Sequence, residues 1–128
     1  MVSIAVPQAP ATASPTPLVN DPDPLIFGGR SFSSRLITGS GKYPDVATMQ
    51  DCVAASGCEM VTVAVRRVQD QLPGHAGLGE ALDWHKIWML PNTAGCKTPE
   101  EAIRVARLGR EMAKLLGDET NNFVKLEV

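Results

Sequence analysis

The sequence predicts an α/β fold with about four parallel strands, and three observations lead to this prediction. Short apolar runs alternate with helical segments from residue 24 onward. Residues 60–65 (MVTVAV) form a near-continuous β-branched run, which is typical of a strand buried on both faces of a parallel sheet. Alternating strands and helices favour parallel pairing through crossover connections. Two architectures fit: a four-stranded open α/β sheet, or half of a (β/α)8 barrel.

The first 23 residues differ in composition from the rest of the chain. They are rich in Pro, Ala, Ser and Thr and show no apolar periodicity. We therefore expect residues 1–23 to be a disordered tail and residues 24–128 to be the folded part. A short hairpin is predicted over residues 25–32, where Gly28 and Gly29 separate two apolar runs and can take the positive φ of a tight primed turn.

Residues 35–38 (RLIT) are predicted to form the first buried strand of the sheet, which the Gly-Ser-Gly sequence at 39–41 ends. A helix is predicted to begin at Pro44-Asp45 and to end at Gly57, because glycine commonly follows the last helical turn. The apolar side chains of this helix fall on one face at helical spacing: Val46, Met49 and Val53.

The second half of the chain repeats this pattern. Residues 66–86 contain several Pro and Gly, and are predicted to be a loop with one helical turn near residues 80–84. Residues 87–90 (IWML) are predicted to be a third strand that stops at Pro91. A long helix follows, because Thr98-Pro99-Glu100-Glu101 is a capping box with proline at the first helical position. Its small-residue stripe comprises Ala102, Ala106, Gly109, Ala113 and Leu116.

The final run, residues 123–128 (FVKLEV), is predicted to be the fourth strand. Side chains alternate at period two in a strand, so Phe123, Lys125 and Glu127 share one face. The opposite apolar face, with Val124, Leu126 and Val128, suits packing under helices. Lys125 would then point into a barrel interior or crevice, where desolvation makes an amine a usable nucleophile toward a carbonyl. A solvated edge strand with a surface Lys/Glu pair is the alternative.

Composition and charge exclude several classes of function. The net charge of −2 leaves no basic footprint for nucleic acid, and no apolar run approaches the ~20 residues of a membrane helix. No secretory signal is visible, and three cysteines are best explained as free thiols in a reducing cytosol, so we expect a cytoplasmic location. His75 and His85 have no partners at metal-ligand spacing, and no metal site is predicted.

Polar residues follow the predicted second and third strands. Arg66 and Arg67 come directly after the second strand and could meet a phosphate or carboxylate, or lie in a solvated loop. Asn92 and Thr93 follow the third strand, where they could donate hydrogen bonds to a substrate or serve turn chemistry alone. Gly39-Ser40-Gly41-Lys42 lacks the leading glycine of a phosphate loop and is a poor match to one.

Several stretches together resemble the N-terminal half of bacterial thiazole synthase. The resemblance runs from about Pro24 to Val128 and is carried by the order and spacing of the motifs AVRR, LPNTAGC and VKLEV. It implies the N-terminal half of a (β/α)8 TIM barrel. The match is weaker after Arg67, through residue 86. Ser40 stands where the family commonly has threonine.

The resemblance also implies an activity in thiamin biosynthesis. The family's Schiff-base lysine, which forms an imine with 1-deoxy-D-xylulose 5-phosphate, matches Lys125, and a nearby acid/base glutamate matches Glu127. Sulfur comes from the thiocarboxylate of a sulfur-carrier protein, and dehydroglycine, made by a separate enzyme, supplies the remaining carbon and nitrogen. The resemblance also implies that the enzyme uses no cofactor and that the full-length protein forms a homo-oligomer. Arg66, Asn92 and Thr93 are the expected substrate-binding residues.

The length is the main departure from the family. The family chain is about twice as long, and a whole barrel takes ~250 residues. We therefore expect a truncated reading frame, a fragment or one half of a split gene, inactive by itself. Two other interpretations stay open: a non-catalytic α/β interaction module derived from the family, and an aldolase-like barrel enzyme that also uses a lysine imine.

Overall fold

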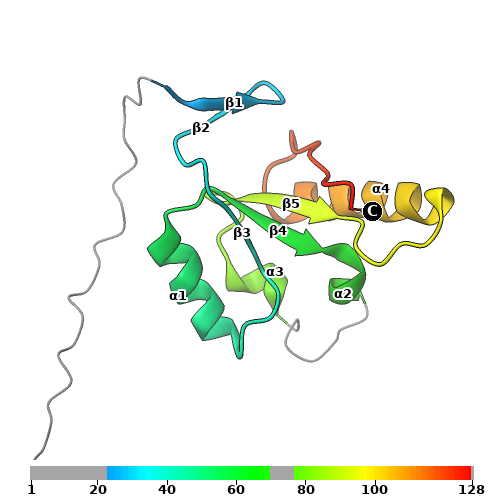
Figure 1. Ribbon diagram of the computed structural model, residues 1–128, viewed down its shortest axis with the longest axis horizontal. Coiled ribbons are helices and arrows are strands. Elements are labelled where there is room, and N and C mark those ends of the chain that lie inside the picture. The colour runs from blue at the N-terminus through cyan, green and yellow to red at the C-terminus, as the bar shows by residue number, and fades with distance from the viewer. Residues whose placement is uncertain (1–22, 70–76, 128) are drawn as a thin grey trace, which may run out of the picture.

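A computed structural model describes residues 23–69 and 77–127 and shows a mixed α/β arrangement (Figure 1). The predicted tail therefore lies outside the described residues, except for Asp23, as does His75. Strands and helices alternate after an N-terminal hairpin. In chain order the elements are β1 (Leu25–Phe27), β2 (Arg30–Phe32), β3 (Ile37–Gly39), α1 (Val46–Ser56), β4 (Met60–Ala64), α2 (Val65–Gln69), α3 (Leu78–Ala81), β5 (Trp88–Asn92) and α4 (Pro99–Leu116).

The sheet is parallel, as predicted, and its strands lie in sequence order. β3 pairs with β4 and β4 pairs with β5, with Met60 opposite Trp88 and Ala64 opposite Asn92. Each strand therefore lies beside the next strand of the chain, without a reversal of strand order among the described strands. Because the strands are parallel, their carboxyl ends all lie at one edge of the sheet.

Helices cover one face of this sheet, which we call the outer face. Its strand side chains Val61, Val63 and Met89 are buried in a core with side chains from α1, α3 and α4. The approach of α4 is especially close, because a Cβ on Gly109 would lie 2.6 Å from the Pro91 Cβ and 2.7 Å from the Val65 Cγ2. A larger side chain at residue 109 would separate the helix from the sheet.

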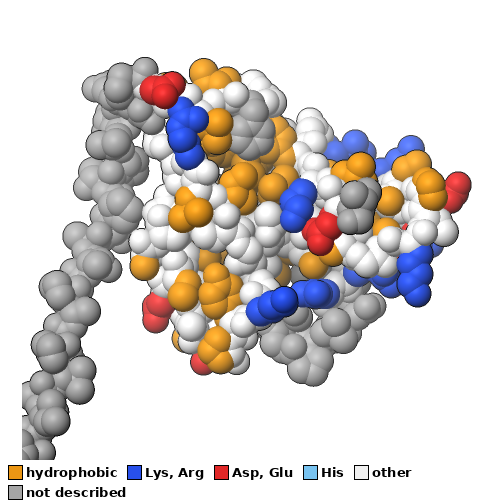
Figure 2. Space-filling model, viewed as in Figure 1, with side chains coloured by type: hydrophobic (Ala, Val, Ile, Leu, Met, Phe, Trp, Pro, Cys, Tyr) orange, Lys and Arg blue, Asp and Glu red, His pale blue; other side chains and the backbone are white. Residues whose placement is uncertain are grey.

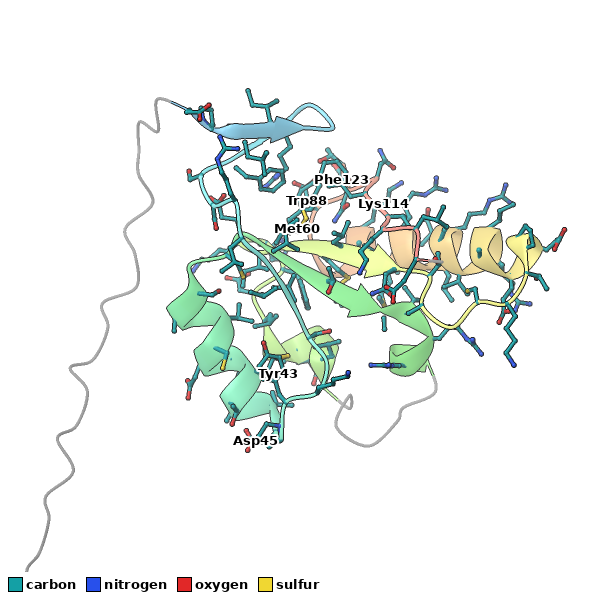
Figure 3. The ribbon with its side chains drawn as sticks, in the orientation of Figure 1. Tyr43, Asp45, Met60, Trp88, Lys114 and Phe123 are labelled. Atoms are coloured by element: carbon teal, nitrogen blue, oxygen red, sulfur yellow. The ribbon has the colours of Figure 1, made fainter. Side chains whose placement is uncertain are left out.

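The hairpin covers the beginning of the other face, which we call the inner face. Phe32 of β2 packs with Met60 and Trp88, the first residues of β4 and β5, and Phe123 joins this cluster. Figure 3 shows Met60, Trp88 and Phe123 gathered beneath the hairpin. The side chain of Glu59 ties the hairpin to the sheet, since its Oε2 accepts the N–H groups of Ser33 at 2.6 Å and Ser34 at 3.1 Å.

The predicted turn and helix ends are confirmed. Gly28 and Gly29 connect β1 and β2 with φ of 56° and 75°, the left-handed values that a primed hairpin turn requires. Asp45 caps α1, since its carboxylate accepts the Thr48 N–H at 2.7 Å, and Gly57 ends the helix at φ 65°. In α4, Thr98 caps the first turn and Gly117 ends it. Local sequence therefore sets these boundaries.

The predicted stop of the third strand at Pro91 is wrong, because β5 continues to Asn92. The carbonyl of Pro91 accepts the Lys125 N–H, so the backbone nitrogen of Pro91 faces the same side, away from β4. The missing N–H of proline thus costs no hydrogen bond between β4 and β5. The position without an N–H therefore faces the segment that carries Lys125, and β5 can include the proline.

The predicted burial of the first strand is also wrong. Leu36 and Ile37 are exposed, because β3 is an edge strand with β4 as its strand neighbour. The predicted strand end at Val65 is instead the start of α2, and the helical turn expected near residues 80–84 is α3, shifted a few residues earlier. No helix among the described residues is long and apolar enough to cross a membrane.

Candidate active site

The segment after α4 runs beside β5, along the edge that does not face β4. It is not the continuous fourth strand that the sequence predicts. It forms one parallel bridge, between Asn92 and Lys125. The Lys125 N–H donates to the Pro91 carbonyl at 2.8 Å, and the Thr93 N–H donates to the Lys125 carbonyl at 3.3 Å. The parallel direction is as expected, and the pairing is much shorter.

The pairing is short because side chains take the neighbouring positions of the ladder. Before the bridge, the Asn121 Nδ2 donates to the Met89 carbonyl at 2.8 Å, and the Phe123 N–H donates to the Asn121 Oδ1 at 3.0 Å. After the bridge, the Glu127 N–H donates to the Thr93 Oγ1 at 3.0 Å. These side-chain bonds take the place of the backbone-to-backbone bonds that a continuous strand would make at these positions.

The bridge places Lys125 on the inner face of the sheet. Asn92 lies on that face because residues 88, 90 and 92 alternate with the outward side chains of β5. Lys125 is paired with Asn92, so it shares this face, and so does Glu127 two residues later. Both lie at the edge where the strands end, opposite the hairpin. In Figure 2, hydrophobic side chains gather beneath the hairpin and charged side chains lie over the strand ends.

Lys125 and Glu127 form an ion pair, with 3.1 Å between Nζ and Oε2. The predicted pairing on one face is confirmed. The expected desolvation is not observed, since the two side chains are 45% and 43% exposed. The reason is their position, because no described strand lies beyond this segment to cover them.

The opposite face of the segment also departs from the prediction. Leu126 is 69% exposed rather than packed under a helix, and Val124 is only half-buried. α4 packs on β5, and among residues 23–69 and 77–127 no helix lies farther out to cover Leu126. Val128 lies outside the described residues.

Asn92 and Thr93 lie beside this pair with different surroundings. Asn92 is buried at the end of β5 on the inner face, and its Oδ1 accepts the Ala94 N–H at 3.1 Å. Thr93 is fully buried, and its hydroxyl also donates to the Glu127 carbonyl at 3.3 Å. The Thr93 hydroxyl therefore both donates a hydrogen bond to the backbone of Glu127 and accepts one from it.

Arg66 lies at the same edge, and its guanidinium contacts the loop after β5. Its Nη1 donates to the Gly95 carbonyl and lies 3.6 Å from Glu101 Oε1, so it joins the end of β4 to the loop after β5. The pKa of Glu101 is lowered, chiefly by the hydrogen bond from the Lys97 N–H and also by the positive charge of Arg66. Arg66 thus supports the loop that follows Asn92 and Thr93.

One residue of this arrangement was missed at the sequence level. Asn121 is 2% exposed and holds the start of the segment against β5. The only sequence signal for it is an asparagine just before a predicted strand, which is ordinary turn chemistry. Among the described residues, no group of three His, Cys, Asp or Glu side chains could hold a metal ion.

Comparisons with known proteins identify the family. The sequence profile of the family described as Thiazole biosynthesis protein ThiG matches residues 26–128. The chain is 71% identical to the thiazole synthase of Trichodesmium erythraeum, over 82% of this chain and 38% of that protein. It is 68% identical to the thiazole synthase of Thermosynechococcus vestitus, over 91% of this chain and 42% of the relative.

A longer relative, named Bifunctional protein ThiO/ThiG, comes from Nostoc sp. It is 73% identical over 88% of this chain and 17% of its own length. The chain thus spans less than half the length of each of these relatives. The match of the family profile to most of the folded part shows that the chain belongs to the ThiG family of thiazole biosynthesis proteins.

Proposed function

We propose that this chain is the N-terminal part of a thiazole synthase barrel and carries its imine-forming lysine, Lys125. The observation that supports this most is the Lys125–Glu127 pair on the inner face, at the end of the strands. Enzymes with a (β/α)8 barrel have their active sites at that edge. Two relatives with more than 65% identity carry the name thiazole synthase.

Two features favour half of a barrel over an open, doubly wound sheet. The strands follow one another in chain order, whereas doubly wound sheets reverse their order at a switch point. The side chains of α1, α3 and α4 all pack on the outer face, whereas doubly wound sheets have helices on both faces. A sheet face on which none of the described helices packs is what the inside of a barrel presents.

The proposed reaction begins at the Lys125 amine. The neutral amine adds to the ketone carbon of 1-deoxy-D-xylulose 5-phosphate, and loss of water gives an imine. The imine acidifies the adjacent C–H, and Glu127, whose carboxylate lies 3.1 Å from the lysine nitrogen, can accept that proton and return it. Sulfur from a carrier-protein thiocarboxylate and atoms from dehydroglycine then complete the thiazole phosphate carboxylate.

The residues around the pair are assigned supporting roles in this proposal. Asn92 is the bridge partner of Lys125 on the same face and is proposed to hydrogen-bond the substrate. Arg66 is proposed to support the rim loop through Gly95, and to bind substrate only if its guanidinium turns inward. The hydroxyl of Thr93 is already engaged by Glu127, so a direct contact to substrate would require giving up that bond.

The test uses the chain together with the C-terminal part of the Trichodesmium erythraeum enzyme that it does not cover. Deoxyxylulose phosphate and borohydride should give one reduced adduct on Lys125, detected by peptide mass. Lys125→Arg should lose the adduct, since arginine keeps the charge without forming the imine. Lys86→Arg is the matched control, because Lys86 is an exposed lysine 3.5 Å from the Asp83 carboxylate. We expect no adduct with the chain alone.

An unmodified Lys125 in the completed protein would contradict the proposal. The exposure of the pair would then favour the second candidate, a non-catalytic α/β module with an ordinary surface ion pair. That candidate predicts a cooperative unfolding transition for the 128-residue chain alone. Turnover of an aldol substrate without a sulfur carrier would instead identify an aldolase-like enzyme.

A further inference from the structure

Two buried side chains hold the segment that carries Lys125, one on each side of its single bridge. Asn121 bonds the Met89 carbonyl before the bridge, and Thr93 bonds both backbone groups of Glu127 after it. They are 2% and 0% exposed, so water does not compete for these bonds. Asn121 thereby bonds β5 and Glu127 bonds the residue directly after it, and β5 is itself fixed between β4 and α4.

This arrangement bears on the direction in which Lys125 points. Because side chains alternate at period two, a slip of one residue against β5 would turn Lys125 to the outer face and bring Val124 or Leu126 inward. One backbone bridge specifies register only weakly. The added bonds at Asn121 and Thr93 fix the register on both sides.

We propose that Thr93 is a positioning residue for Lys125 and Glu127, with Asn121 as its counterpart at the other end of the segment. This inference rests on the proposed function. Thr93 lies next to Asn92, the bridge partner of Lys125, and its hydroxyl is bonded to the backbone of Glu127 itself. It acts through the backbone, and its side chain does not touch the reacting atoms.

The geometry explains why threonine serves here. A hydroxyl both donates and accepts, and Thr93 uses both capacities, toward the Glu127 carbonyl at 3.3 Å and from the Glu127 N–H at 3.0 Å. Valine has the same shape without either capacity, and serine keeps both with less volume. These two replacements therefore separate the hydroxyl from the packing.

The experiment compares Thr93→Val and Thr93→Ser in the completed protein described above. Thr93→Val should lower kcat about tenfold or more with little change in KM, since the amine and carboxylate are misaligned but the substrate site remains. Thr93→Ser should stay within about threefold of wild type. Thr38→Val is the matched control, because that strand threonine bonds Cys58 at 3.0 Å on the far side of β4 and should keep full activity.

Amide hydrogen exchange supplies a readout that does not depend on turnover. The Glu127 amide should exchange about fivefold faster or more in Thr93→Val, as expected for the loss of one hydrogen bond. The exchange rate of the Glu127 amide should be unchanged in Thr93→Ser, and the exchange rates of the β4 amides should be unchanged in both variants.

The outcomes separate this inference from the proposed function. A Thr93→Val protein with wild-type kcat, or with β4 amides that speed up equally, overturns the positioning role. Loss of activity in Thr93→Ser as large as in Thr93→Val overturns it too, because packing would then be the cause. A wild-type protein without an imine adduct contradicts the proposed function instead, and the Glu127 amide still decides whether Thr93 holds the segment.

Discussion

The two faces of the sheet are closed in different ways. The outer face is covered by helices along the strands, with Val61 and Val63 fully buried. The inner face is closed by the hairpin and aromatic side chains only where the strands begin, and it is polar and open where they end. The comparison indicates that stability is concentrated on the outer face and under the hairpin, and that the strand ends are free to serve chemistry.

The largest expected effect breaks the outer face. Gly109→Val should destabilise the completed protein by about 3 kcal/mol, because the new side chain cannot fit between Pro91 and Val65 without moving α4. Urea unfolding measures the loss as a lower midpoint. Arg107→Val, at an exposed position of the same helix, is the control and should change stability by about 0.5 kcal/mol. Equal losses in the two variants would show that close packing is not the cause.

A smaller effect is expected beneath the hairpin. Phe123 packs edge-on against Trp88 with 5.4 Å between ring centroids and also contacts Phe32. Because Phe123 is only partly buried, Phe123→Ala should cost about 2 kcal/mol, below the range for a fully buried phenylalanine. Phe123→Leu should recover about half of the loss. Unchanged unfolding of Phe123→Ala would mean that the hairpin does not close the inner face.

A pH-dependent effect is expected at the start of α1. The hydrogen bond from the Thr48 N–H lowers the pKa of Asp45 below its ordinary value of 3.8. The cap therefore stabilises the fold above that pH, and the contribution disappears as the pH falls through the lowered pKa. Asp45→Ser keeps an acceptor that does not titrate, so its stability should depend less on pH in the acid range. Parallel pH profiles of wild type and variant would contradict this assignment.

The smallest effect is expected at the open end of the inner face. Lys125→Met should change the free energy of unfolding by less than about 0.5 kcal/mol, because the ion pair with Glu127 is nearly half exposed. The same variant should abolish imine trapping in the completed protein. A loss of stability as large as that of Phe123→Ala would mean that this end of the face is structural.

Local patterns predicted much of the fold. The hairpin turn at Gly28-Gly29 and the caps at Asp45, Gly57 and Thr98 were predicted correctly, because each depends on bonds among residues close in the chain. The small-residue stripe predicted for α4 is buried at Gly109 and Ala113, and Val105, which lies outside the predicted stripe, is buried as well. Strand ends were less predictable, as Val65 and Pro91 show, because the partner on each side decides whether a strand continues.

The sequence by itself determined that Lys125 and Glu127 share one face, since period-two alternation follows from backbone geometry alone. Tertiary structure decided which face that is, how exposed the pair is, and what holds it. The bonds of Thr93 and Asn121 join residues about 32–34 positions apart, so no local pattern announces them. The bridge between Asn92 and Lys125, together with these side-chain bonds, places the pair on the inner face, because register is set by contacts between distant segments.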